Sequence, residues 1–311
     1  IRVALAVGTS HYYSWHTTAT CGTYGAAAGA AKLLGLDEDQ FAWALGSAGT
    51  QAAGLWEFLV ECAMSKQLHP GKAAMNGLLA ALLAKEGFTG ARRILEGEKG
   101  FFRATSKNFD EGKCTADLGK VFHGDRNSIK YHASCGHTHS AIDAVQLATG
   151  GRTLKAAEVA DVRIQVYQAA IDLLGNVEAK SPYLAKFNLP FCIATALLFG
   201  HVRLDDFSEA RLADAEIRNL MSKVSFTVDP ELTKAYPRKW PARVTITLAD
   251  GRKLEACNEY PKGDPENPLT ASELVAKFKG LAGGILSGSQ MDRIVDKVMS
   301  LEKIADANEL F

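Results

Sequence analysis

Side chains that can transfer protons or bind anions gather in three short windows of the sequence. The first is Trp15-His16-Thr17-Thr18-Ala19-Thr20, and the second is Ser65-Lys66-Gln67-Leu68-His69-Pro70-Gly71. The third runs from Lys130 to His139 and holds three of the eight histidines. Each window places a lysine or histidine among small polar residues just before a predicted helix. Because helix N-termini attract anions and imidazole titrates near neutral pH, this pattern suits a cleft that binds carboxylates.

Each window also has an ordinary structural interpretation. His16 alone fits a buried histidine bonded to a backbone carbonyl, and Lys66 alone fits a solvated surface lysine. Cys135, His137 and His139 suggest zinc, since H-x-H on an extended segment puts both rings on one side. No C-x-x-C or H-x-x-x-H elsewhere supplies further ligands. We therefore expect no metal site.

Motifs of several other enzyme classes are missing from the sequence. Gly46-Ser47-Ala48-Gly49 is not the G-x-S-x-G elbow of a serine hydrolase. The chain has no G-x-x-x-x-G-K-[ST] loop for nucleotide phosphates and no G-x-G-x-x-G dinucleotide fingerprint. These absences argue against serine hydrolysis, nucleotide hydrolysis and dinucleotide binding.

Length and composition limit the possible partners. A chain of 311 residues has the length of about two domains. Its 35 basic and 35 acidic residues cancel, which argues against nucleic acid as the main partner. The longest apolar run, 78–84, is too short to cross a membrane. The six cysteines form no C-x-x-C pair, so we expect reduced thiols in a cytoplasmic protein.

The first third of the chain has the spacing and capping signals of consecutive helices. Asp37 with Gln40 resembles a capping box, Pro70 fits a first helical turn, and Gly87 fits a helix end. Gly22, Gly25 and Gly29 form a small-residue face that lets another helix approach closely. The predicted helices cover 21–36, 37–51 and 73–86. This part of the chain is predicted to be all-α.

Beyond about residue 120 the pattern changes to alternating strands and helices. Asp250-Gly251 is a strong hairpin signal. The predicted strands are 162–167, 224–228, 242–248 and 253–260. The predicted helices are 140–147, 190–199, 209–222, one capped by Thr270 with Glu273 and broken at Gly283-Gly284, and 291–308. We expect an α+β region with an antiparallel sheet.

The windows also carry a family resemblance. The segments that carry it are 15–28, 44–55, 65–71, 135–143, 185–191 and 262–268. They begin with Trp-His-Thr-Thr-Ala-Thr-Cys-Gly-Thr-Tyr-Gly and include Ser-Lys-Gln-Leu-His-Pro-Gly and Cys-Gly-His-Thr-His. Together they resemble the MmgE/PrpD family, which includes 2-methylcitrate dehydratase, cis-aconitate decarboxylase and iminodisuccinate epimerase.

The resemblance implies an architecture and an assembly. It implies a helical domain built from early and late segments, 1–129 and 285–311, with a smaller α+β lid at 130–284. It also implies a homodimer that works without metal or organic cofactor. Family members are longer at the N-terminus, and this chain begins at Ile1. We therefore expect a missing piece of the helical domain, exposed apolar helix faces, and weak or absent activity of this chain alone.

The resemblance also implies site residues. His16, Lys66, His69 and Lys130 fall on catalytic positions. The predicted substrate-binding residues are Thr17, Cys135, His137, His139 and Phe191. Cys135 stands where decarboxylase members carry histidine, and Phe191 stands where they carry tyrosine. Both departures count against cis-aconitate decarboxylase.

The function implied is that of a lyase acting on a small di- or tricarboxylic acid. The favoured reaction is dehydration of a 2-methylcitrate-like acid by removal of a proton next to a carboxylate. Epimerisation of an iminodisuccinate-like dicarboxylate and decarboxylation use the same fold and stay open. A non-catalytic remnant or partner subunit is a further alternative.

Overall fold

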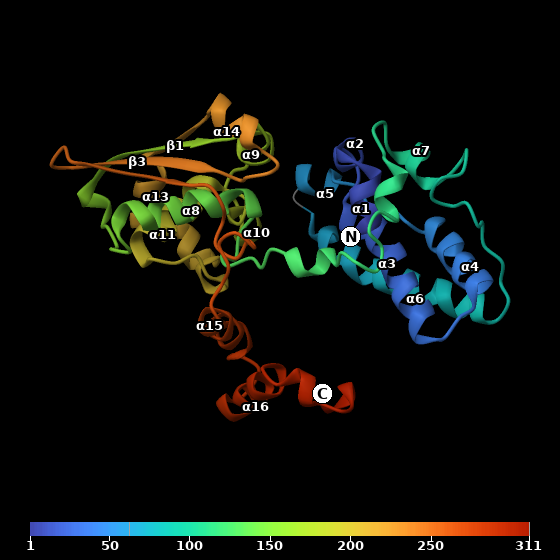
Figure 1. Ribbon diagram of the computed structural model, residues 1–311. Coiled ribbons are helices and arrows are strands. Elements are labelled where there is room, and N and C mark those ends of the chain that lie inside the picture. Colours follow the sequence, from blue (N-terminus) through green and yellow to red (C-terminus); the bar gives the residue numbers. More distant parts are fainter. Residues whose placement is uncertain (62, 311) are drawn as a thin grey trace. The chain divides into compact units, whose positions relative to one another are not determined.

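The chain folds into two compact units, which the computed structural model describes over residues 1–61 and 63–310 (Figure 1). The helical unit comprises Ile1–Asp125, and the α+β unit comprises Arg126–Phe311. The predicted combination of helices with a small sheet is confirmed. The predicted domain boundaries, including a return of 285–311 to the helical part, stay predictions.

Among the described residues of the helical unit, the regular elements are helices and turns. They are α1 (Arg2–Val7), α2 (Thr9–Tyr12), α3 (Thr17–Leu33), α4 (Glu38–Gly49), α5 (Glu57–Val60), α6 (Leu68–Lys85) and α7 (Phe101–Thr105), with the 3₁₀ turns η1 (Met64–Gln67), η2 (Glu111–Cys114) and η3 (His123–Arg126).

Local sequence signals explain where these helices begin and end. Asp37 and Gln40 cap α4 reciprocally, so the predicted capping box is confirmed. Pro70 lies in the first turn of α6, where the absence of its N–H costs no helical hydrogen bond. Gly87 follows α6 with φ of 86°, a left-handed conformation that glycine adopts without strain.

Helices α3 and α6 pack closely through small residues. A Cβ at Gly77 of α6 would lie 2.4 Å from Cβ of Ala26, and one at Gly22 would lie 3.4 Å from Cβ of Ala73. A Cβ at Gly25 or Gly29 would meet nothing within 4 Å. The close approach on α3 was thus predicted, but Gly25 and Gly29 take no part in it.

The α+β unit surrounds one sheet. Its helices are α8 (Gly136–Thr149), α9 (Gln168–Leu174), α10 (Pro182–Ala185), α11 (Leu189–Phe199), α12 (Glu209–Ala213), α13 (Ala215–Met221), α14 (Pro230–Ala235), α15 (Ala271–Ala282) and α16 (Gly288–Val298). Its strands are β1 (Val159–Val166), β2 (Val224–Val228), β3 (Ala242–Leu248) and β4 (Lys253–Asn258). Figure 1 shows α8, α11 and α13 together on one side of this sheet.

The sheet is mixed, which corrects the prediction of an antiparallel sheet. Its order is β2-β1-β3-β4; β1 pairs with β3 and β3 with β4 in antiparallel register, whereas β1 pairs with β2 in parallel. Residues 167–223 join β1 to β2 and contain five helices, and a connection of this length permits a parallel crossover. The D-G hairpin between β3 and β4 is confirmed.

In the helical unit, the predicted helices 21–36 and 73–86 begin earlier, at Thr17 and Leu68. Three predicted helices of the α+β unit also have different bounds. Helix α8 begins at Gly136 rather than at residue 140. The predicted helix 209–222 divides into α12 and α13, because Asp214 is extended and its carboxylate accepts from the N–H groups of Glu216 and Ile217. The last predicted helix begins at Gly288, after a Ser287 capping box, and ends at Val298.

The surface of the helical unit carries an apolar strip on α6. Met75, Leu78, Leu79 and Leu82 are between 44% and 62% exposed. The expectation of an exposed apolar helix face is confirmed here. Over the described residues, no helix combines the length and apolar character needed to cross a membrane.

Candidate active site

His16 lies at the junction of α3 with a short antiparallel bridge. It is the N-cap of α3, as the first window predicted, and Thr17 is the first residue of that helix. Trp15 pairs with Leu55 in an isolated bridge. The N–H of His16 donates to the carbonyl of Gly54 at 2.9 Å. The bridge therefore holds segment 54–56 beside the start of α3.

His69 meets His16 across this junction. It lies in the first turn of α6, and its Nδ1 is 2.9 Å from Nδ1 of His16. Both imidazoles are buried. Lys66 lies in the preceding turn η1, close enough to act electrostatically on both rings. The structure thus brings together three of the four predicted catalytic residues within the helical unit.

Burial and positive neighbours keep this histidine pair uncharged. Burial, then His69 and Lys66, lower the pKa of His16 from 6.5 to about 4. Burial, then Lys72 and Lys66, also lower the pKa of His69. A burial penalty falls on the charged form of an imidazole, and nearby cations act in the same direction. At neutral pH both rings are therefore neutral.

A hydrogen bond between two Nδ1 atoms fixes complementary roles for two neutral rings. One ring carries its proton on Nδ1 and donates it, which leaves its Nε2 as a lone-pair acceptor. The other ring accepts at Nδ1 and so carries its proton on Nε2. The pair consequently offers one base and one acid.

Aromatic side chains that the sequence analysis did not identify surround the pair. The rings of His16 and Trp56 lie 4.7 Å apart, and those of Phe58 and His69 lie 5.4 Å apart. Nζ of Lys66 lies 6.0 Å from the centre of the Phe58 ring. An apolar wall of this kind strengthens electrostatic contacts with a bound anion. The sequence of segment 54–58 has no regular spacing that predicts this aromatic wall. A glycine at position 54 is the one signal, because it allows another segment to approach the backbone closely.

The third window lies in the α+β unit at the start of α8. Nζ of Lys130 donates to the carbonyl of Ser134 at 3.2 Å. Cys135 is the N-cap of α8 and is partly exposed, and its N–H donates to the carbonyl of Lys186 at 2.8 Å. Lys130 and Cys135 therefore lie near a helix N-terminus, as the window predicted.

His137 and His139 lie inside α8, so the premise of an extended H-x-H segment is wrong. Nδ1 of His137 is 2.6 Å from the hydroxyl of Tyr167, and its ring stacks on Trp240 at 4.6 Å. Nε2 of His139 is 3.4 Å from the carbonyl of Ser134. Burial, then Lys130, lower the pKa of His137 to about 4. Among the described residues, no cluster of three His, Cys, Asp or Glu side chains could hold a metal ion.

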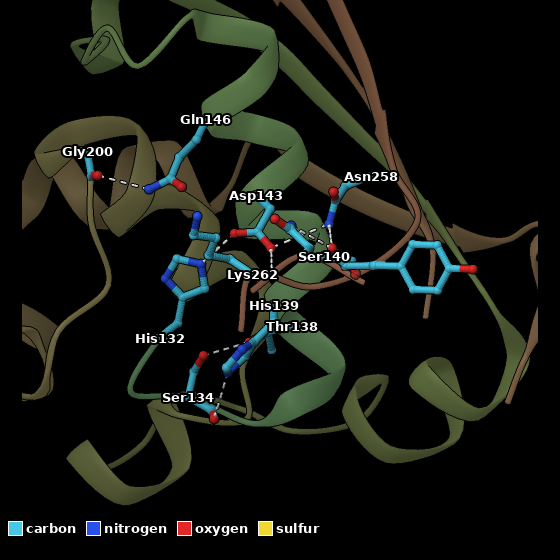
Figure 2. A network of polar contacts seen from close by, with 12 residues as sticks. His132, Ser134, Thr138, His139, Ser140, Asp143, Gln146, Gly200, Asn258 and Lys262 are labelled. Carbon is cyan, nitrogen blue, oxygen red and sulfur yellow. Dashed lines mark hydrogen bonds and ion pairs between the residues drawn. The ribbon is translucent and has the colours of Figure 1, made fainter. Parts of the chain in front are cut away.

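Asp143 anchors a buried polar network that the sequence analysis did not predict (Figure 2). Its Oδ1 lies 2.8 Å from Nε2 of His132, and its Oδ2 accepts from the N–H of Lys262 at 2.7 Å and from the amide of Asn258 at 3.4 Å. The network ties the Lys130 segment and the loop after β4 to α8. We interpret its role as holding these segments in place against α8.

Phe191 lies in the core of the α+β unit. Its side chain is fully buried in α11, with its ring 5.6 Å from that of Phe207. The structure therefore gives this ring a packing role. The predicted contacts of Thr17, Cys135, His137, His139 and Phe191 with a substrate stay predictions.

The fold and this cluster define a two-unit chain with an acid–base histidine pair beside a lysine. Residues 1–112 match the MmgE/PrpD N-terminal domain, and residues 132–301 match the MmgE/PrpD C-terminal domain. The chain belongs to the MmgE/PrpD family, which confirms the resemblance.

Relatives of two activities are similar to the chain. The cis-aconitate decarboxylase of Aspergillus terreus is 30% identical over 317 residues, covering 95% of this chain and 64% of the relative. A cis-aconitate decarboxylase-like protein of Aspergillus oryzae is 29% identical over 312 residues, with the same shares. The 2-methylcitrate dehydratase of Cupriavidus necator is 27% identical over 268 residues, covering 80% of this chain and 54% of the relative. The chain spans less than two thirds of these relatives' length.

Proposed function

We propose that this chain carries acid–base machinery of a lyase that acts on a small tricarboxylic or dicarboxylic acid. The observation that supports the proposal is the 2.9 Å contact between Nδ1 of His16 and Nδ1 of His69, beside Lys66. Dehydration of a 2-methylcitrate-like acid is the favoured reaction.

The histidine pair can perform both proton transfers of a dehydration. The ring with an unprotonated Nε2 removes a proton from the carbon next to a carboxylate, and that electron pair forms the new double bond. The other ring donates its Nε2 proton to the departing hydroxyl, which leaves as water. The Nδ1 proton crosses the 2.9 Å contact at the same time, so both rings end neutral with their roles exchanged.

Lys66 supplies the charge that this step requires. Removal of the proton leaves negative charge on the adjacent carboxylate, and a fixed ammonium stabilises that charge more strongly in a site with little water. The N-terminus of the 17-residue helix α3, directly after His16, adds partial positive charge. A catalytic role of Lys130, in the α+β unit, stays a prediction.

Decarboxylation is the second proposed reaction. It is favoured by the cis-aconitate decarboxylases, which match 95% of this chain, whereas the dehydratase of Cupriavidus necator matches 80%. The same acid would then protonate the carbanion left by loss of CO₂. Cys135 stands where decarboxylase members are implied to carry histidine, which weighs against this reaction.

The test measures turnover of 2-methylcitrate, citrate, cis-aconitate and iminodisuccinate by proton NMR over hours. Loss of water indicates dehydration, release of CO₂ indicates decarboxylation, and uptake of solvent deuterium without either indicates epimerisation. Substituting His16→Asn or His69→Asn should lower kcat roughly 10²- to 10⁴-fold. His123→Asn, a histidine of the turn η3, is the matched control and should leave kcat unchanged.

Two outcomes contradict the proposal. The chain neither binds nor turns over any of the four acids, or His16→Asn and His69→Asn retain the unsubstituted chain's binding and kcat. A homodimer is proposed as the assembly, and light scattering coupled to size exclusion would contradict it by giving the mass of one 33.4 kDa chain.

A further inference from the structure

Trp56 is held against the histidine pair by the chain's backbone. Its backbone N–H donates to the carbonyl of Ser14 at 3.1 Å, next to the bridge that joins Trp15 and Leu55. This pairing brings the indole to 4.7 Å from the His16 ring, between centroids. The indole also contacts Phe58 at 5.3 Å. It therefore forms part of the wall beside His16.

The indole nitrogen of Trp56 lacks an acceptor. Nε1 is enclosed by its surroundings and makes no hydrogen bond to any described residue. Indole nitrogen can only donate, and buried donors in folded proteins nearly always have a partner. The residue as a whole is only partly buried. A carboxylate bound beside the histidine pair would supply the missing acceptor.

We propose that Nε1–H of Trp56 donates a hydrogen bond to a carboxylate oxygen of the bound acid, which makes Trp56 a substrate-binding residue. The inference rests on the proposed function. Lys66 contributes charge without a fixed direction, whereas the indole N–H contributes a directed donor. An uncharged donor also suits this position, because a further cation beside His16 would lower its pKa again.

The variant Trp56→Phe keeps an aromatic ring and removes the donor together with part of the ring area. Titration calorimetry with citrate should give a dissociation constant roughly 10- to 100-fold higher than that of the unsubstituted chain. In turnover assays the variant should raise KM by a similar factor and change kcat little. Trp43→Phe is the matched control and should bind citrate normally. Trp43 lies in α4 and packs against a core cluster formed by Ala31, Ala44, Ala81 and Ala84.

A second measurement needs no folded variant. In ¹⁵N-labelled protein the Trp56 indole N–H resonance should move downfield on citrate addition and exchange more slowly with solvent. The indole resonances of Trp15, Trp43 and Trp240 provide internal references.

The outcomes separate this inference from the proposed function. In one outcome citrate binds the chain, and His16→Asn weakens this binding, but Trp56→Phe binds citrate normally and the indole resonance does not shift. The inference is then wrong and the proposed function stands. If the chain binds none of citrate, 2-methylcitrate, cis-aconitate and iminodisuccinate, both are wrong. An indole N–H already hydrogen-bonded without ligand also overturns the inference.

Discussion

Gly54 lies against His69, and substituting it with alanine should disturb the histidine pair. A Cβ at Gly54 would lie 2.3 Å from Cβ of Ala19 and 3.3 Å from Cε1 of His69. Ala19 belongs to the first turn of α3, so it cannot yield without moving that helix. Segment 54–56 must move instead, which weakens the bond from His16 N–H to the Gly54 carbonyl. Overpacking of this kind costs about 1–3 kcal/mol.

Two assays read the consequence of Gly54→Ala. Urea unfolding followed by circular dichroism should show a loss of stability of about 1–3 kcal/mol. Histidine NMR should show the pKa of His16 rising from about 4 toward 6.5, because burial and His69 together hold it low. Gly25→Ala is the matched control: its new Cβ meets nothing within 4 Å, and a glycine-to-alanine change inside a helix should stabilise by roughly 0.5–1 kcal/mol.

The reasoning is refuted if Gly54→Ala unfolds at the same urea concentration as the unsubstituted chain and leaves the His16 titration unchanged. That result would mean that the backbone at Gly54 does not limit the space around His69. A gain of stability in both Gly54→Ala and Gly25→Ala would lead to the same conclusion about the space around His69.

Three further predictions concern the α+β unit. The free energy of unfolding should fall as pH drops from 6.5 to about 4, because His137 binds a proton more readily in the unfolded chain. The burial of His137 contributes about 3 kcal/mol to this fall. A free energy of unfolding that stays constant over this pH range in urea titrations would contradict the prediction. Asp143→Ala should destabilise by roughly 2–5 kcal/mol, since the buried His132 and the N–H of Lys262 lose their acceptor, and thermal unfolding unchanged from that of the unsubstituted chain would disprove this. Thr195→Val should be neutral or slightly stabilising, because among the described residues its buried hydroxyl has no partner, and a clear loss in the melting temperature would count against it.

Local rules in the sequence were sufficient for many elements and for part of the site. The capping box of Asp37 and Gln40 and the hairpin at Asp250-Gly251 depend on neighbours in the chain, so the sequence predicts them correctly. The windows before two predicted helices singled out His16 and His69, and the family resemblance placed them on catalytic positions. Their direct contact could not be predicted, since it depends on how α3 packs on α6.

The misjudged elements depend on contacts between distant segments. Strand β2 pairs in parallel with β1 only because the long connection returns on that side of the sheet. Trp56 and Gly54 reach the histidines through an isolated bridge to Trp15, which leaves no periodic pattern in the sequence. His132 and Asp143 lie eleven residues apart, and their pairing requires the turn that precedes α8.

The different exposure of Phe191 and Cys135 changes how strongly each departure from the decarboxylase pattern counts against decarboxylation. Phe191 is fully enclosed beside Phe207, and a tyrosine there would have to bury its hydroxyl and find a partner for it. Its identity therefore bears on packing within the α+β unit. Cys135 is partly exposed at the N-terminus of α8, beside the Lys130 segment. Of the two departures, Cys135 therefore weighs more against decarboxylation, because position 135 is partly exposed and Phe191 is fully buried.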